Sequence, residues 1–130
     1  MPQQASRLSC RTLGASVSIN TTTSVPKEIA TRALVAVETH PLRAEAVQWS
    51  YCVHDVFAMS KTFIDRGRFS EEEKDKLLSA LTNEESILLV SYYTSSEKPD
   101  PLSGAGNHYV FLLHPTTLEV LQSSVGTWRS

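Results

Sequence analysis

The sequence predicts an α+β fold in which three N-terminal helices pack on an antiparallel sheet of three to four strands that ends in a C-terminal hairpin. Three observations lead to this prediction. Before residue 83, apolar residues recur at the three- and four-residue spacing of helices over long stretches. After residue 86, apolar residues alternate with other residues as in strands. A short turn joins the last two of these alternating stretches. Helices followed by antiparallel strands bury their apolar sides most simply as a helical layer on a sheet.

The 130 residues are predicted to form one domain over residues 14–130, which is long enough to bury a core without a metal or a disulfide. Residues 1–13 are polar and without period, so this leader is predicted to be disordered. Directly after it, the alternation of Ala15, Val17 and Ile19 with polar residues indicates a short edge strand.

The first predicted helix covers residues 26–39. Pro26 suits the first turn of a helix, because its missing N–H would have no partner there. An apolar face follows, and His40 precedes Pro41, which pushes His40 out of the helical region and ends the helix.

A second, longer helix is predicted over about residues 43–66, with Gly67 as its left-handed cap. A strand is the competing interpretation, because alternate residues from Val47 to Val53 are also apolar or aromatic. The apolar stripe extends beyond the length of a strand, which favours the helix. Its members recur at three- and four-residue steps: Trp49, Cys52, Val53, Val56, Phe57, Ser60, Phe63 and Ile64.

The third helix is predicted over residues 71–82. Ser70 and Glu73 have the spacing of a capping box, and the first turn is acidic, as the helix dipole favours.

Strands are predicted over residues 86–94, 108–114 and 118–123. The first has apolar residues on both faces and is therefore expected at the centre of the sheet. A long loop with two prolines and two glycines follows it, and a turn at Pro115 joins the last two strands.

Charge is unevenly spread along the chain. Residues 1–70 carry 8 basic and 5 acidic residues, whereas residues 71–130 carry 4 basic and 9 acidic ones. The net charge of −2 argues against a nucleic-acid-binding protein, and no apolar stretch is long enough to span a bilayer. The uneven charge is consistent either with a mosaic of solvated faces or with a bipolar docking surface.

Two cysteines, Cys10 and Cys52, do not make a disulfide framework, and their pairing would require the leader to fold back. The N-terminus has no apolar run of signal-peptide length. These observations predict a reduced, cytoplasmic protein.

Chemically active residue types are few. Cys52 falls on the apolar stripe, which favours a core residue over a nucleophile. His54 and Asp55 are interpreted as a solvated surface or, alternatively, as part of a site. His108 lies at the mouth of the long loop, where a pocket could form, but it is too far from His114 for one metal ion. No metal or cofactor motif is present, so neither is expected.

Most of the predicted binding residues are aromatic. Tyr and Trp combine a rigid apolar body with a polar tip and are favoured in binding sites. Trp49, Tyr92 and Tyr109, together with His108, are therefore the predicted binding residues; the alternative is that the aromatic rings lie at the edge of the core.

The stretch HYVFLLHPTTLEVLQSSVGT, preceded by helices, a strand and a glycine-containing loop, resembles small bacterial NTF2-like and cystatin-like α+β proteins, which include immunity-type proteins. The resemblance covers mainly residues 86–126. It implies a cone-shaped fold with a pocket or a sheet surface that binds a ligand or a protein. No catalytic residues are carried over by it.

Two functions follow as hypotheses. The first is a non-enzymatic protein-binding or ligand-binding domain, such as an immunity-type inhibitor or adaptor. It would dock through its sheet face or its acidic C-terminal half onto a protein partner, a second copy or a small apolar ligand. The second is a small NTF2-like enzyme in which His54, Asp55 and His108 form an acid/base set and Tyr92 or Tyr109 donates hydrogen bonds.

Overall fold

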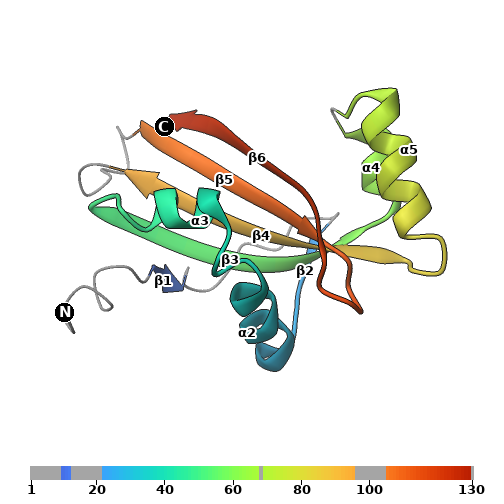
Figure 1. Cartoon of the computed structure of the whole chain (residues 1–130), viewed down its shortest axis with the longest axis horizontal. Helices are drawn as coiled ribbons and strands as arrows, with labels where there is room; N and C mark the ends of the chain where they lie inside the picture. The colour runs from blue at the N-terminus through green and yellow to red at the C-terminus, as the bar shows by residue number, and fades with distance from the viewer. Residues whose placement is uncertain (1–9, 13–21, 68, 96–104, 130) are drawn as a thin grey trace.

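The computed structural model of the chain describes residues 10–12, 22–67, 69–95 and 105–129. It shows an α+β fold with one mixed sheet and four helices in the described part of the chain (Figure 1). In chain order the elements are β1 (Arg11–Thr12), β2 (Thr22–Ser24), α2 (Lys27–Ala36), α3 (Pro41–Ala46), β3 (Tyr51–Ser60), α4 (Thr62–Arg66), α5 (Glu71–Ala80), β4 (Ser86–Ser95), β5 (Ala105–Leu113) and β6 (Val120–Arg129).

The sheet is built around four antiparallel strands in the order β3-β4-β5-β6. At the β3 edge, β1 forms a parallel pair with one part of β3, and β2 forms an antiparallel pair with another part. Val56, Val90 and Phe111 are direct neighbours across β3, β4 and β5 and lie on one face. Asp55 and Ser91 are direct neighbours on the opposite face, because successive side chains of a strand alternate.

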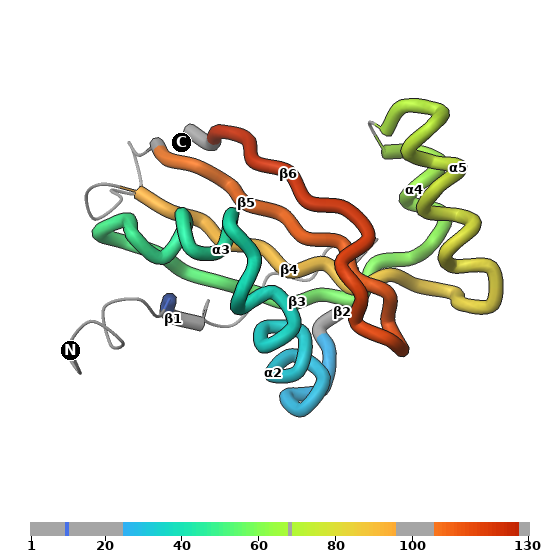
Figure 2. Tube along the Cα trace, viewed as in Figure 1, coloured from blue at the N-terminus to red at the C-terminus, as the bar shows by residue number. Residues whose placement is uncertain are grey.

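Helices α2 and α3 cover the face that carries Val56, which we call the covered face (Figure 1). The opposite face is packed at one end by α4 and α5, which lie well away from α2 and α3 (Figure 2). Its remaining part contains Asp55, Ser91, Tyr93 and His108, and we call it the open face because no helix of the described ranges packs on it. The core under α4 and α5 consists of Met59, Ile64, Leu77, Leu81, Ile87, Leu112 and Leu121.

The structure confirms a helix within each of the predicted ranges 26–39 and 71–82, and it confirms the C-terminal hairpin. The capping box at the start of α5 is formed, since the Ser70 side chain accepts from the Glu73 N–H and the Glu73 carboxylate accepts from the Ser70 N–H. The strand predicted over 86–94 is β4, and it lies inside the sheet, as its two apolar faces indicated.

The predicted helix over 43–66 is wrong, because residues 51–60 form β3 between the short helices α3 and α4. Core packing explains the error. Val56 faces α2 and α3, whereas Met59 packs in the core under α4 and α5. Apolar residues therefore occupy both faces of β3, which hides the two-residue period of a strand and imitates helical spacing.

Two related expectations are corrected with it. The helices are not three N-terminal ones, because α4 and α5 are inserted between β3 and β4. Gly67 is extended (φ −75°, ψ 175°) and not left-handed. A Cβ at Gly67 would lie 2.8 Å from the Phe69 ring and 3.0 Å from the Phe63 carbonyl oxygen, so close packing accounts for the glycine.

Other predictions lie outside the described residues. These include the edge strand around residues 15–19, most of the loop between β4 and β5, and residues 1–9 of the leader. At the end of the leader, Arg11 and Thr12 pair with Val53 and His54 of β3.

Cys10 and Cys52 form a disulfide, which corrects the expectation of reduced cysteines. The pairing is possible because β1 lies alongside β3, so the described end of the leader, residues 10–12, does fold back onto the sheet. Of the helices in the described ranges, none combines the length and the apolar composition that a bilayer crossing requires.

Candidate functional site

The sheet separates the residues that the sequence suggested as an acid/base set. His54 lies on the covered face, where its ring packs against Tyr92 at 5.9 Å between centroids. Asp55 and His108 lie on the open face. Because neighbouring residues of a strand point to opposite faces, His54 and Asp55 cannot act on one substrate together.

The predicted binding residues are also divided. Tyr92 and Tyr109 are buried in the core, at 2% and 0% exposure. The Tyr109 hydroxyl accepts hydrogen bonds from Trp49 Nε1 and Asn107 Nδ2, both at 3.1 Å. These contacts use the polar tips of Trp49 and Tyr109 inside the protein.

The open face carries a compact polar and aromatic group. The His108 and Tyr93 rings stack at 4.1 Å with an interplanar angle of 9°. His108 Nε2 lies 3.3 Å from the Ser91 hydroxyl, in hydrogen-bond contact. Burial lowers the pKa of His108, which favours the neutral ring at neutral pH.

Asp55 lies on the same face, and its carboxylate binds the backbone of its own strand, β3. Its Oδ1 accepts a hydrogen bond from the Val56 N–H at 2.9 Å, while its Oδ2 is buried without a hydrogen-bond partner. Burial raises the pKa of Asp55 and outweighs the lowering by the Val56 N–H and by His54. Burial is the main cause that raises the pKa of Tyr93, and the charge of Asp55 raises it further.

A cleft lies between α5 and the start of β6. Its volume is about 590 Å³, which is within the usual range for binding pockets. We call it the β6 cleft. Its lining combines charged side chains of α5 with part of the edge strand: His40, Glu72, Glu73, Lys76, Val120, Leu121, Gln122 and Ser123.

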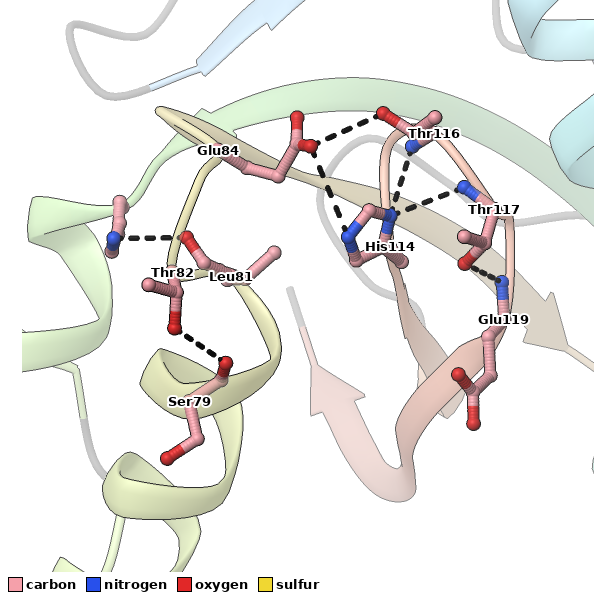
Figure 3. A network of polar contacts seen from close by, with 9 residues as sticks. Ser79, Leu81, Thr82, Glu84, His114, Thr116, Thr117 and Glu119 are labelled. Atoms are coloured by element: carbon pink, nitrogen blue, oxygen red, sulfur yellow. Dashed lines mark hydrogen bonds and ion pairs between the residues drawn. The ribbon is translucent and has the colours of Figure 1, made fainter.

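A polar network holds the turn before β6 against the end of the α4–α5 pair (Figure 3). His114 Nδ1 accepts from the Thr116 and Thr117 N–H groups at 3.0 and 3.1 Å. The Thr116 hydroxyl donates to Glu84 Oε2 at 3.2 Å, and His114 Nε2 lies 4.0 Å from the same oxygen. Glu84 follows α5, so this network joins α5 and β6, the two walls of the β6 cleft.

Sequence reasoning did not single out Glu72, Lys76 or Gln122 as site residues. The acidic run at the start of α5 was interpreted as a helix start signal, which it also is. The signal that could have indicated the cleft is the excess of acidic residues after residue 70.

No family model, curated protein or solved structure matches the chain. The resemblance to NTF2-like and cystatin-like proteins therefore stays a prediction. Among the residues that the structure describes, no three His, Cys, Asp or Glu side chains gather closely enough to hold a metal ion.

Proposed function

We propose that the protein is a non-enzymatic protein-binding domain that docks through its acidic C-terminal half. Its site is the free edge of β6 together with the β6 cleft, and its ligand is an extended segment of a partner protein that carries a basic side chain. The observation that carries this proposal is a ten-residue strand whose outer edge has no partner among the described residues and is bordered by a cleft with carboxylates.

An edge strand offers a row of unpaired backbone N–H and C=O groups. A partner segment that adds to the sheet gains affinity from these groups, and specificity comes from pockets that take its alternate side chains. The β6 cleft supplies such a pocket beside residues 120–123. The exposed residues that follow, Ser124 to Thr127, leave room for the backbone of a partner.

Charge indicates which side chain the cleft would take. Glu72 and Glu73 line it with a single basic residue, Lys76, and Glu84 and Glu119 flank the turn before β6. A lysine or arginine of the partner would therefore find an attractive field.

Two features support an immunity-type or adaptor version of this function. Helices α2 and α3 precede the four antiparallel strands β3 to β6 and cover one face of the sheet, as expected for an NTF2-like or cystatin-like protein. The acid/base set of the enzyme hypothesis is divided between the two faces.

The disulfide bears on where this function takes place. Disulfides persist in oxidising compartments and are rare in the cytosol. The Cys10–Cys52 bond therefore favours an oxidising compartment over the expected cytoplasm. Thiol alkylation of protein taken from its own cells, before and after reduction, distinguishes the two locations.

A library of random peptides displayed on phage, selected on the immobilised protein, tests the proposal. We expect enrichment of extended β-branched sequences with a lysine or arginine, and we expect their binding to weaken as salt is raised. Glu72→Lys should abolish binding of the selected peptides. Glu28→Lys, on the exposed first turn of α2, is the matched control and should not.

Three outcomes overturn the proposal. The selection yields no enriched sequences, the enriched sequences lack basic residues, or Glu72→Lys leaves their binding unchanged. A dimer in light scattering that a β6 variant dissociates would assign this edge to a second copy of the chain instead.

The small-enzyme hypothesis is the second candidate, and one observation favours it. Asp55, Ser91, Tyr93 and His108 share the open face, and burial shifts the pKa of Asp55 up and that of His108 down. NMR titration of His108 in wild type and in Asp55→Asn tests it. An acid/base pair requires the His108 pKa to change in the variant, whereas separate groups predict no change.

A further inference from the structure

A second, smaller cavity lies on the covered face, and its lining residues Glu38 and Arg43 flank His40 of the β6 cleft in the sequence. Its volume is about 180 Å³, below the range of pockets that bind drug-sized ligands, so it suits a ligand of few atoms. It lies where α2 and α3 meet β3 and the chain before β1. The lining residues are Cys10, Thr31, Leu34, Val35, Glu38, Arg43, His54 and Tyr92.

The cavity contains one permanent cation and one anion that are not paired with each other. Among the described residues no ion pair joins Arg43 to Glu38, although both line the same space. Arg43 Nε is buried and has no hydrogen-bond partner. Since Nε itself has no accessible surface, a ligand in the cavity would meet the terminal N–H groups of the Arg43 guanidinium, and an acceptor placed there would make a charge-assisted hydrogen bond.

Tyr92 is influenced by both of these charges. Burial raises the pKa of the Tyr92 hydroxyl, a hydrogen bond from Arg43 and the charge of Arg43 lower it, and the charge of Glu38 raises it. The hydroxyl is therefore within the field of both groups. His54 is the other polar group of the wall, and burial is the largest cause that lowers its pKa, which favours the neutral ring at neutral pH.

Charge complementarity selects the ligand. A simple anion would be attracted by Arg43 but repelled by Glu38. A simple cation would be attracted by Glu38 but repelled by Arg43. A molecule with a carboxylate and an ammonium group a short distance apart satisfies both. The planar guanidinium matches a carboxylate, and Leu34 and Val35 offer apolar contact for a short side chain.

We infer that this cavity binds a small α-amino acid, with its carboxylate on Arg43 and the Tyr92 hydroxyl and its ammonium group on Glu38. The Cys10–Cys52 disulfide holds one wall of the cavity in place. This site is separate from the proposed protein-binding edge and goes beyond the proposed function.

Titration of the isotope-labelled, oxidised protein with alanine, followed by amide NMR spectra, tests the inference. We expect saturable shifts at Thr31, Leu34 and Val35 with a Kd on the order of 1 mM or below. Acetate and methylammonium are the matched probes, since each carries one of the two charges. Each should bind at least about tenfold more weakly than alanine, since each loses one charge-assisted contact.

Two variants locate the contacts. Arg43→Met and Glu38→Gln should each weaken alanine binding by about tenfold or more. Arg32→Met and Glu28→Gln, at exposed positions of α2 that do not line the cavity, should leave it unchanged. Should Arg43→Met fail to fold, Glu38→Gln still decides the question, because Glu38 is exposed.

Three results overturn the inference: no saturable shift with alanine, equal binding of acetate and alanine, or unchanged binding in the folded Glu38→Gln variant. Peptide selection on the β6 edge does not depend on this cavity, so failure of the amino-acid site leaves the proposed function untouched, and the reverse also holds.

Discussion

The two edges of the sheet are treated in opposite ways. At the β3 edge, β1 pairs with Val53 and His54, and β2 pairs with the segment from Phe57 to Met59. The disulfide further fastens the chain before β1 to Cys52. At the β6 edge, the only pairing in the described part of the chain is with β5.

Asp55 completes the contrast. It lies in the short gap between the two segments of β3 that pair with β1 and β2, and its carboxylate accepts the Val56 N–H there. Within the described ranges the β6 edge has no comparable protection. Its segment from Val120 to Trp128 contains no proline or lysine, the residues that natural edge strands use to prevent pairing, and Val125 is 47% exposed. Among the described residues one edge is therefore paired and the other is not, which is the arrangement that the proposed docking edge requires.

Removing the disulfide should have the largest effect on this contrast. Cys10→Ser opens a link between residues 42 positions apart, and the chain-entropy model gives a loss of about 3–4 kcal/mol in the free energy of unfolding. Urea denaturation of wild type and variant measures it. Adding a reductant should destabilise wild type by a similar amount and leave Cys10→Ser unaffected. An unchanged midpoint would show that the β3 edge is held without the covalent link.

A lysine at Ala58 should have the next largest effect. Ala58 faces the covered side between Thr23 of β2 and Leu88 of β4 and packs against the core there. Ala58→Lys forces a long charged side chain into this space, and we expect a loss of about 2 kcal/mol. Ala80→Lys, exposed at the end of α5, is the control and should be nearly neutral. A small effect at Ala58 would mean that β2 does not close the edge tightly.

Local signals predicted the elements that carry a clear start or turn. α5 was predicted from its capping box, and the C-terminal hairpin from its alternation and turn. β3 was not, because the helices that pack on each of its faces come from other parts of the chain. That information is tertiary, and the spacing of apolar residues in one segment does not contain it.

The site residues show the same limit. Whether His54 and Asp55 meet depends on whether their segment is a helix or a strand, so the error on β3 carried over to the acid/base hypothesis. The pairing of Cys10 with Cys52 depends on a two-residue strand, β1, whose partner is far along the chain. Composition did retain one useful signal, the acidic C-terminal half, because charge excess does not require knowledge of the fold.

At the entrance to β6, His114→Ala should destabilise the protein by about 1–2 kcal/mol. The substitution removes the acceptor of the Thr116 and Thr117 N–H groups. Thermal unfolding measures the loss. His114→Asn can supply a carbonyl acceptor and should recover part of it. If His114→Ala also lowers binding of the selected peptides, the turn is needed to place the β6 cleft; if stability is unchanged, the network of Figure 3 does not fix the turn.

We expect mildly acidic pH to destabilise the protein at the β3 edge, because His54 is harder to protonate in the folded state than in the unfolded chain. Burial, assisted by the Arg43 charge and opposed by Asp55, lowers the pKa of His54 in the folded state. The unfolded chain therefore binds more protons at mildly acidic pH, so stability falls as the pH drops through the ordinary histidine range. Denaturation midpoints at neutral and mildly acidic pH should differ less in His54→Gln than in wild type. His108→Gln should act in the same direction, since burial lowers the pKa of His108 too. Equal pH dependence in wild type and both variants would contradict this account.

The smallest effect on stability is expected at the open edge itself. Val125 is exposed on β6, so Val125→Lys should change the free energy of unfolding by no more than about 0.5 kcal/mol. It should nevertheless weaken binding of the selected basic peptides, because a lysine on an edge strand disfavours the addition of another strand and repels their charge. Val125→Thr keeps the shape of the side chain without charge and is the matched control. A large loss of stability in Val125→Lys would show that the β6 edge is covered within the protein, and the contrast between the two edges would then fail.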